Sequence, residues 1–170
     1  MTTQRSTERS GPTPKLSDPY LLSKAYPEPT ICPSCGLVFH KKRWIRDQHI
    51  LDEVSAVAPK HKCPACRKID DHYFMGQVII DGDFLLTVKS EIVNLIHNQE
   101  KKEFFQNPLA RIMSLKNQKD NIVIETTTDN LAVMIGKALQ RSHSGELNIS
   151  FSGDKIARVH WHRDLEKTKK

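Results

Sequence analysis

The sequence lacks any long apolar run. No stretch of its 170 residues approaches the roughly 18 to 20 apolar residues that a membrane-spanning helix requires. The first fifteen residues, MTTQRSTERSGPTPK, are polar and charged and do not contain the apolar region of a secretion signal. We therefore expect a cytoplasmic protein that has no membrane partner.

Cysteine is scarce, and all four cysteines fall into two CxxC pairs, Cys32/Cys35 in TICPSCG and Cys63/Cys66 in KCPACRK. Two thiolates three residues apart on a tight turn can reach one ion, and a second pair completes a tetrahedral shell. Gly36 follows the first pair, where a positive φ angle is often needed. The pattern predicts structural Zn²⁺ bound by Cys32, Cys35, Cys63 and Cys66, although the sequence does not distinguish zinc from iron.

Other uses of these cysteines fit the pattern less well. A redox CxxC normally opens a helix within a βαβ unit, and neither pair here precedes an obvious amphipathic helix. A disulfide framework is typical of secreted chains. The nearby histidines are expected to be surface groups or to support the ligands, because four cysteines suffice; they are His40, His49, His61 and His72. Four protein ligands leave no open coordination position, so the metal is predicted to be structural.

Catalytic motifs are also missing. The sequence contains neither GxxxxGK[ST] nor GxSxG. The run Asp70-Asp71-His72 and the pair Asp81 and Asp83 are interpreted as polar turns. His160 and His162 would share one side of a strand, but no third metal ligand lies nearby in the sequence. We expect a protein that is not an enzyme.

Positive charge is unevenly distributed within the net +6 of the chain. Residues 31–74 carry eight Lys/Arg against five Asp/Glu, whereas residues 75–162 carry ten of each. Zinc would bring the basic runs around the two CxxC pairs together, and such a surface can bind a phosphate backbone. The predicted contacts are Lys41, Lys42, Arg43, Arg46, Arg67 and Lys68. An ordinary solvated surface is the alternative.

Prolines suggest where the chain is irregular. Five of the nine lie within residues 1–30, which we predict to be disordered, although Tyr20 and Tyr26 offer apolar anchors for local docking. Residues 31–74 form the cysteine module, with a helix expected in RWIRDQHILDEVSAVA. Residues 163–170 form a short basic tail.

Residues 75–162 alternate strand and helix signals. GQVIIDGDFLL predicts a strand, and Ser90 is expected to cap the helix that follows. LARIMSLK and NIVIETT predict a hairpin, Thr128 caps a second helix, and ELNISFS with KIARVHWH predicts a final hairpin. Phe151 and Trp161 are expected to be packed, because the aromatic signature of an RNA-recognition domain is missing.

This order predicts an α+β protein: an N-terminal zinc-ribbon-like module, then a ferredoxin-like split βαβ domain with an extra C-terminal strand. Two helices should cover one face of an antiparallel sheet. The other face would be free to meet a partner.

The motifs CPSCG and CPAC, with EIVNLIHNQEKKEFFQNPLARI and TTTDNLAVMIGKALQRSHSGEL, resemble a small bacterial family with a double-CxxC zinc ribbon. The arrangement is similar, more loosely, to the N-terminal half of the archaeal and eukaryotic export adaptor family of the large ribosomal subunit. That family usually has more CxxC pairs and binds ribosomal particles. The resemblance covers most of residues 31–162 and implies that the four cysteines bind metal and that RNA or a ribosomal particle is the partner.

These observations favour a zinc-binding, non-enzymatic RNA-binding or ribosome-associated accessory protein. The alternative is a zinc-stabilised module for protein–protein interaction or regulation, acting through the ferredoxin-like sheet. An enzyme that uses a cleft between the two modules has the least support.

Overall fold

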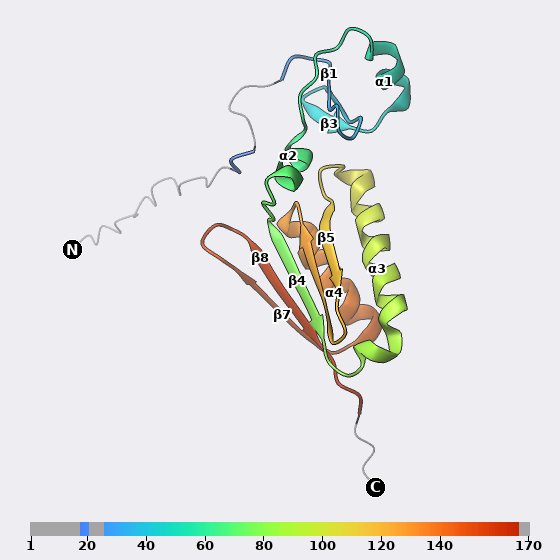
Figure 1. Ribbon diagram of the computed structural model, residues 1–170, viewed down its shortest axis with the longest axis vertical. Coiled ribbons are helices and arrows are strands. Elements are labelled where there is room, and N and C mark those ends of the chain that lie inside the picture. The colour runs from blue at the N-terminus through green and yellow to red at the C-terminus, as the bar shows by residue number, and fades with distance from the viewer. Residues whose placement is uncertain (1–17, 21–25, 167–170) are drawn as a thin grey trace, which may run out of the picture.

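A computed structural model describes residues 18–20 and 26–166 of the chain. The cysteine module lies at one end of a long molecule, and a larger α/β domain occupies the other end (Figure 1). Most of the predicted disordered segment 1–30 and half of the basic tail 163–170 lie outside the described residues. Within the first of these, Tyr20 is buried against Tyr73 and its hydroxyl donates to the Asp71 carboxylate at 2.8 Å. Tyr20 is therefore docked, where the sequence favoured a linker.

The cysteine module contains a small antiparallel sheet of three strands in the order β1-β2-β3. These are β1 (Thr30–Ile31), β2 (Val38–His40) and β3 (Arg43–Ile45). Lys41 and Lys42 form the tight turn between β2 and β3, and both have positive φ. The Glu28 carboxylate accepts hydrogen bonds from the backbone N–H groups of both lysines, at 2.8 and 2.9 Å. This contact holds the turn in place.

Two short helices complete the module: α1 (Gln48–Val54) and α2 (Pro64–Asp70). The helix expected over residues 43–58 is thus shorter than predicted, because Trp44 belongs to β3. Trp44 pairs directly with Phe39 across the sheet and is buried there, and this cross-strand aromatic contact favours a strand over a helix. Helix α1 begins after Asp47, whose carboxylate accepts from the Ile50 N–H at 3.1 Å.

The α/β domain has five strands in the order β5-β6-β4-β8-β7. The strands are β4 (Gly76–Asp81), β5 (Ile112–Asn117), β6 (Asn121–Thr126), β7 (Glu146–Phe151) and β8 (Ala157–His162). The helices are α3 (Leu85–Gln106) and α4 (Asp129–His143). Both helices pack their apolar residues on the same side of the sheet. The fold class, α+β with a split βαβ arrangement, agrees with the prediction.

The extra strand lies inside the sheet. Strand β8 is inserted between β4 and β7 and runs parallel to β4, so the sheet is mixed where a purely antiparallel one was expected. Alternate residues of β8 explain this position, because Ala157, Val159 and Trp161 are all buried. Strand β7 has no fully buried residue, which suits the edge of a sheet.

Helix α3 begins earlier than predicted. The sequence pattern predicts that Ser90 caps this helix, but a first helical turn already begins at Leu85, and a kink at Val88 separates it from the longer part of the helix. The turn at residues 82–84 leads directly into this first helical turn, and the Leu85 side chain is fully buried. Burial of Leu85 therefore accounts for this first turn, and Ser90 lies two residues after the kink, near the start of the longer part of the helix.

Trp161 belongs to the core of this domain and is completely buried, while its indole N–H donates to the Ser144 carbonyl at 2.7 Å. Phe151, which was expected to be packed, is 57% exposed at the end of edge strand β7. The sheet face away from the helices carries mainly polar side chains, such as Gln77, Arg158 and His160. This open face therefore lacks the aromatic platform of an RNA-recognition domain.

Thr128 is the N-cap of the second helix of this domain, as predicted, and its hydroxyl accepts from the Leu131 N–H at 3.3 Å. We expect Thr128→Ala to destabilise the protein by about 1 kcal/mol, because one N-terminal N–H loses its partner. The change in the urea midpoint would measure this loss. Ser142→Ala on the same helix is the control, since Ser142 is exposed and its replacement should change stability by less than about 0.5 kcal/mol. Equal effects of the two substitutions would contradict the capping role.

Candidate metal centre

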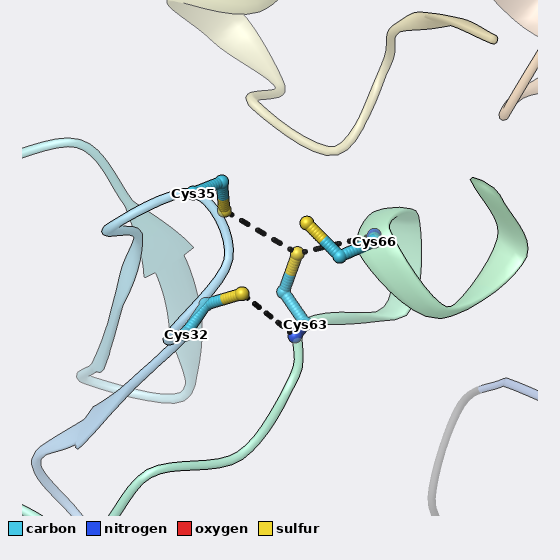
Figure 2. Close-up of side chains that lie close together, drawn as sticks. All are labelled: Cys32, Cys35, Cys63 and Cys66. Carbon is cyan, nitrogen blue, oxygen red and sulfur yellow. Dashed lines mark hydrogen bonds between the residues drawn. The ribbon is translucent and has the colours of Figure 1, made fainter. Parts of the chain in front are cut away.

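The first CxxC pair lies on the tight turn that follows β1. The Gly36 N–H donates to the Cys32 carbonyl at 2.9 Å, and the Cys32 N–H donates to the Leu37 carbonyl at 2.8 Å. Gly36 has a φ of +75°, a conformation that glycine adopts without strain. This agrees with the positive φ predicted for Gly36, and the turn directs both thiols to the same side (Figure 2).

The second pair opens helix α2. Cys63 is the N-cap, Pro64 occupies the first turn, and the Cys66 N–H donates to the Cys63 sulfur at 3.4 Å. No obvious amphipathic helix was expected at either pair, so α2 was not predicted. The helix has only seven residues, too few for a clear amphipathic pattern. The Pro64 that follows Cys63 was the available signal, because proline is favoured in the first turn of a helix.

Backbone pairing brings the two pairs together across 31 positions of sequence. The Ile31 N–H donates to the Pro59 carbonyl at 2.9 Å, and the His61 N–H donates to the Ile31 carbonyl at 3.0 Å. The Cys63 N–H then donates to the Cys32 sulfur at 3.3 Å. The segment before α2 therefore lies beside β1, which places both cysteine pairs at one point.

The four sulfurs all lie within 4.8 Å of one another, and Figure 2 shows them converging from the two segments. The Cys35 and Cys63 sulfurs are 3.7 Å apart. Four sulfurs at about 2.3 Å from one zinc ion form a tetrahedron with edges of about 3.8 Å, so this separation fits such an ion. It is far longer than the roughly 2.05 Å of a disulfide, and all four cysteines are free.

Among the residues that the structure describes, these cysteines are the only group of three or more His, Cys, Asp or Glu side chains placed to hold a metal ion together. His40, His49, His61 and His72 are not part of it. Cys32 and Cys63 are completely buried, and Cys66 is nearly so. The arrangement is therefore that of a closed, four-sulfur metal site.

Crowding of the thiols shifts their proton affinities. Hydrogen bonds with Cys32 and Cys63 lower the pKa of the Cys35 thiol below its ordinary value, and Arg111 adds to this effect. The hydrogen bonds with Cys32 and Cys35, together with burial, raise the pKa of Cys63. Burial and the hydrogen bond with Cys35 raise the pKa of Cys66 to about 11. Negative charge in the cluster is thus favoured at Cys35, which lies next to a cation.

That cation is Arg111, which the sequence analysis did not single out. Its guanidinium group donates to the sulfurs of Cys35 at 3.2 Å, Cys66 at 3.4 Å and Cys63 at 3.9 Å. The Arg111 Nε–H donates to the Pro108 carbonyl at 3.1 Å, and the Arg111 N–H donates to the Thr127 hydroxyl at 2.8 Å. Burial lowers the pKa of Arg111, but the hydrogen bond and charge of Cys35 raise it more strongly, so the net shift is upward.

Arg111 comes from the connection between α3 and β5, so the α/β domain contributes directly to the surroundings of the cysteines. Phe104 and Leu109 of the same domain also pack against the buried cluster that contains the cysteines. This cluster includes Leu37, Phe39 and Trp44 of the module. The metal centre therefore lies at the junction between the module and the α/β domain.

The basic residues predicted to contact phosphates are placed in two different environments. Lys41, Lys42 and Arg43 are exposed on or beside the β2–β3 turn, and Arg46 is exposed just after the other end of β3. Arg67 is half-buried, with its guanidinium 5.3 Å from the centre of the Tyr20 ring. Arg67 therefore offers less of its charge to a ligand than the four exposed residues do.

Lys68 does not fit a phosphate contact. It is only 5% exposed, its ammonium group lies 2.5 Å from the Asp18 carboxylate, and it also donates to the Thr127 carbonyl at 3.3 Å. Lys68 is therefore removed from the predicted phosphate-binding residues. The sequence showed only that Lys68 is a charged residue next to Arg67. In the structure its side chain extends from α2 toward the α/β domain.

A cleft runs between the module and the end of α3. Two neighbouring hollows of about 460 and 490 Å³ share Arg46, Phe104 and Phe105 as lining residues. Arg43 lines one hollow, and Lys101 and Arg111 line the other. The Arg46 guanidinium lies 5.2 Å from the centre of the Phe104 ring. We call this region the Phe104–Phe105 cleft; the predicted site residues in its lining are Cys35, Arg43 and Arg46.

A second polar cluster lies on the open face of the sheet. His160 and His162 both contact the Asp81 carboxylate, at 2.8 and 2.5 Å. Burial raises the pKa of Asp81, but these hydrogen bonds outweigh it, so the pKa lies below its usual value. The same contact with Asp81, and one with Asp164, raise the pKa of His162. Asp81 is thus an ion-pair partner, where a simple turn residue was expected.

No helix within the described residues is long and apolar enough to cross a membrane. The sequence matches none of the protein-family models with which it was compared, and a comparison with curated proteins also finds no match. The protein is therefore described by its fold and its cysteine site. It is an α+β protein with a small N-terminal module and a split βαβ domain, and a four-cysteine candidate metal site lies where the two meet.

Proposed function

We propose that the protein is a non-enzymatic RNA-binding accessory protein in which structural zinc holds the RNA-binding module together. The observation that carries the metal assignment is the convergence of four free cysteine sulfurs within 4.8 Å. Thiolate ligands in a tetrahedral set are typical of structural zinc. Four sulfurs complete the coordination shell, which leaves no position for a substrate.

The exposed cations beside this centre support the RNA assignment. The β2–β3 turn presents Lys41, Lys42 and Arg43 to solvent, and Arg46 follows on the same side of the cleft. Because Glu28 accepts from the turn backbone, the turn is fixed before any ligand arrives. A rigid basic turn is suited to phosphates, since less order has to be created on binding. The resemblance to ribosome-binding adaptors makes ribosomal RNA the first candidate.

Salt dependence tests this proposal. We expect the wild-type protein to bind a fluorescein-labelled oligouridine of about 12 nucleotides, with an affinity that falls steeply as salt rises. In Lys42→Ala/Arg43→Ala the slope of log affinity against log salt should become shallower by about 1.4, because each lost phosphate contact on a single strand contributes about 0.7. Fluorescence anisotropy at several salt concentrations measures both quantities.

The matched control is Lys137→Ala/Arg141→Ala, which removes two exposed charges from α4. This variant should keep the wild-type slope. Wild-type binding that does not respond to salt would refute the proposal, and an equal loss in both double variants would show that only net charge matters. Sedimentation of native lysate before and after nuclease treatment then tests the ribosomal assignment. A complex that survives nuclease would favour the alternative, a module for protein–protein interaction.

A further inference from the structure

Phe105 is an apolar side chain in an unusual setting. It lies in the last turn of α3, is 90% exposed and lines both hollows of the Phe104–Phe105 cleft. Its neighbour Phe104 is instead packed against the cysteine cluster. Packing of Phe104 therefore explains why α3 ends against the module. It does not explain why the next residue, Phe105, exposes its ring to solvent. Exposed aromatic surface in a cleft is a common mark of a binding site.

The charges around this ring point to a polyanion. The exposed cations Arg43, Arg46 and Lys101 line the cleft together with Arg111. Two carboxylates also line it, Glu100 and Asp47. Each of these carboxylates accepts a backbone N–H, that of Ile112 at 2.7 Å for Glu100 and that of Ile50 at 3.1 Å for Asp47. Their acceptor oxygens are thus partly engaged within the protein, whereas the exposed cations are available to a ligand.

We propose that the Phe104–Phe105 cleft binds unpaired nucleotides, with Phe105 stacking against a base while Arg43, Arg46 and Lys101 contact the flanking phosphates. This inference rests on the proposed function and specifies the class of RNA. A duplex covers its base faces by stacking, so an exposed phenyl ring selects single strands, loops and ends. The phenyl ring has no hydrogen-bonding group, and stacking of this kind tolerates any base.

A substitution at Phe105 separates stacking from charge. We expect Phe105→Ala to weaken binding of the labelled oligouridine by about 5- to 150-fold, the range associated with loss of one base–aromatic stack. The salt slope should stay at the wild-type value, because no charge is removed. Phe105→Tyr keeps an aromatic ring and should bind within about threefold of wild type.

Phe151→Ala is the control, since Phe151 is also an exposed phenylalanine but lies on β7, outside the lining of the cleft. This variant should bind as wild type. A duplex of matched sequence and length is the second probe, and its weaker binding should be the same for wild type and Phe105→Ala. Because Phe105 is almost fully exposed, its replacement should leave the circular dichroism spectrum and melting temperature unchanged.

The proposal is overturned if Phe105→Ala binds oligouridine as wild type does, or if Phe151→Ala loses as much affinity. It is also overturned if oligoglutamate competes as well as unlabelled oligouridine, since charge alone would then account for binding to the cleft. Wild-type protein that binds no RNA would refute the proposed function itself. If RNA binding depends on salt but is equally strong in wild type and Phe105→Ala, only the stacking site is refuted.

Discussion

Replacing Cys63 with serine is expected to abolish metal binding and to unfold the cysteine module. Cys63 is completely buried, caps helix α2 and lies within 3.7 Å of the Cys35 sulfur. Structural zinc contributes about 10 to 16 kcal/mol to the folding of small domains, far more than a sheet of two- and three-residue strands can supply. Elemental analysis should give one zinc per wild-type chain and less than a tenth of that in Cys63→Ser.

Hydrogen–deuterium exchange measures the structural part of this result. In Cys63→Ser the segments 30–45 and 60–70 should lose their protection, while strands β4 and β8 keep theirs. The α/β domain has its own buried cluster, which includes Ile80, Ile124 and Trp161, so it does not depend on the module for a core. Chelation of zinc from the wild-type protein should produce the same exchange pattern.

The matched control is Ser34→Ala, which alters an exposed residue between Cys32 and Cys35 on the turn that follows β1. It should bind one zinc and keep full protection. Gently purified wild-type protein without stoichiometric metal, or with disulfides between these cysteines, would contradict the metal centre. Iron in place of zinc would preserve the architecture and change only the identity of the ion.

Replacing Arg111 with glutamine is expected to lower the zinc affinity by about 10- to 100-fold, the effect typical of losing a group that supports metal ligands. Four thiolates around Zn²⁺ carry a net charge of −2, and Arg111 is the cation that donates to three of the four sulfurs. Glutamine keeps some hydrogen-bonding capacity but removes the charge. Competition with a chromophoric chelator measures the affinity.

Arg111→Lys should show an intermediate loss, because an ammonium group retains the charge but cannot place two planar N–H groups on neighbouring sulfurs. Arg141→Gln is the control, since Arg141 is exposed on α4. If Arg111→Gln retains zinc as tightly as Arg141→Gln, the guanidinium group does not support the centre. Because Arg111 belongs to the α/β domain, we also expect faster amide exchange in α2 of Arg111→Gln.

Local features of this protein could be predicted because they depend on residues close together in the chain. The Thr128 cap and both hairpins of the α/β domain follow from capping chemistry and from the two-residue side-chain period of strands. The start predicted at Ser90 was about two residues late, because the non-helical residue is Val88, and the prediction missed the additional turn that begins at the buried Leu85. Capping preferences of about 1 kcal/mol yield to burial of a large side chain, which contributes more.

The site was only partly predictable. The four cysteines could be identified as metal ligands because each CxxC pair has the spacing of a metal-binding turn, which is visible in the sequence. Arg111, Phe104 and Phe105 lie more than 35 residues beyond Cys66, and nothing in their local sequence relates them to the cysteines. Lys68 was assigned to the basic surface from its neighbours, but one helical turn decides whether such a side chain faces solvent or the adjoining domain.

The sequence by itself determined the four thiol ligands, the order of strands and helices in the α/β domain and the excess of positive charge in the module. Only the tertiary structure decided that β8 lies inside the sheet, that Arg111 reaches the sulfurs and that Phe105 stands in a cleft with Arg43 and Arg46. The physical reason is the range of the interactions. Turns, caps and periodic patterns act over a few residues, whereas strand order and charge compensation depend on which distant surfaces bury one another.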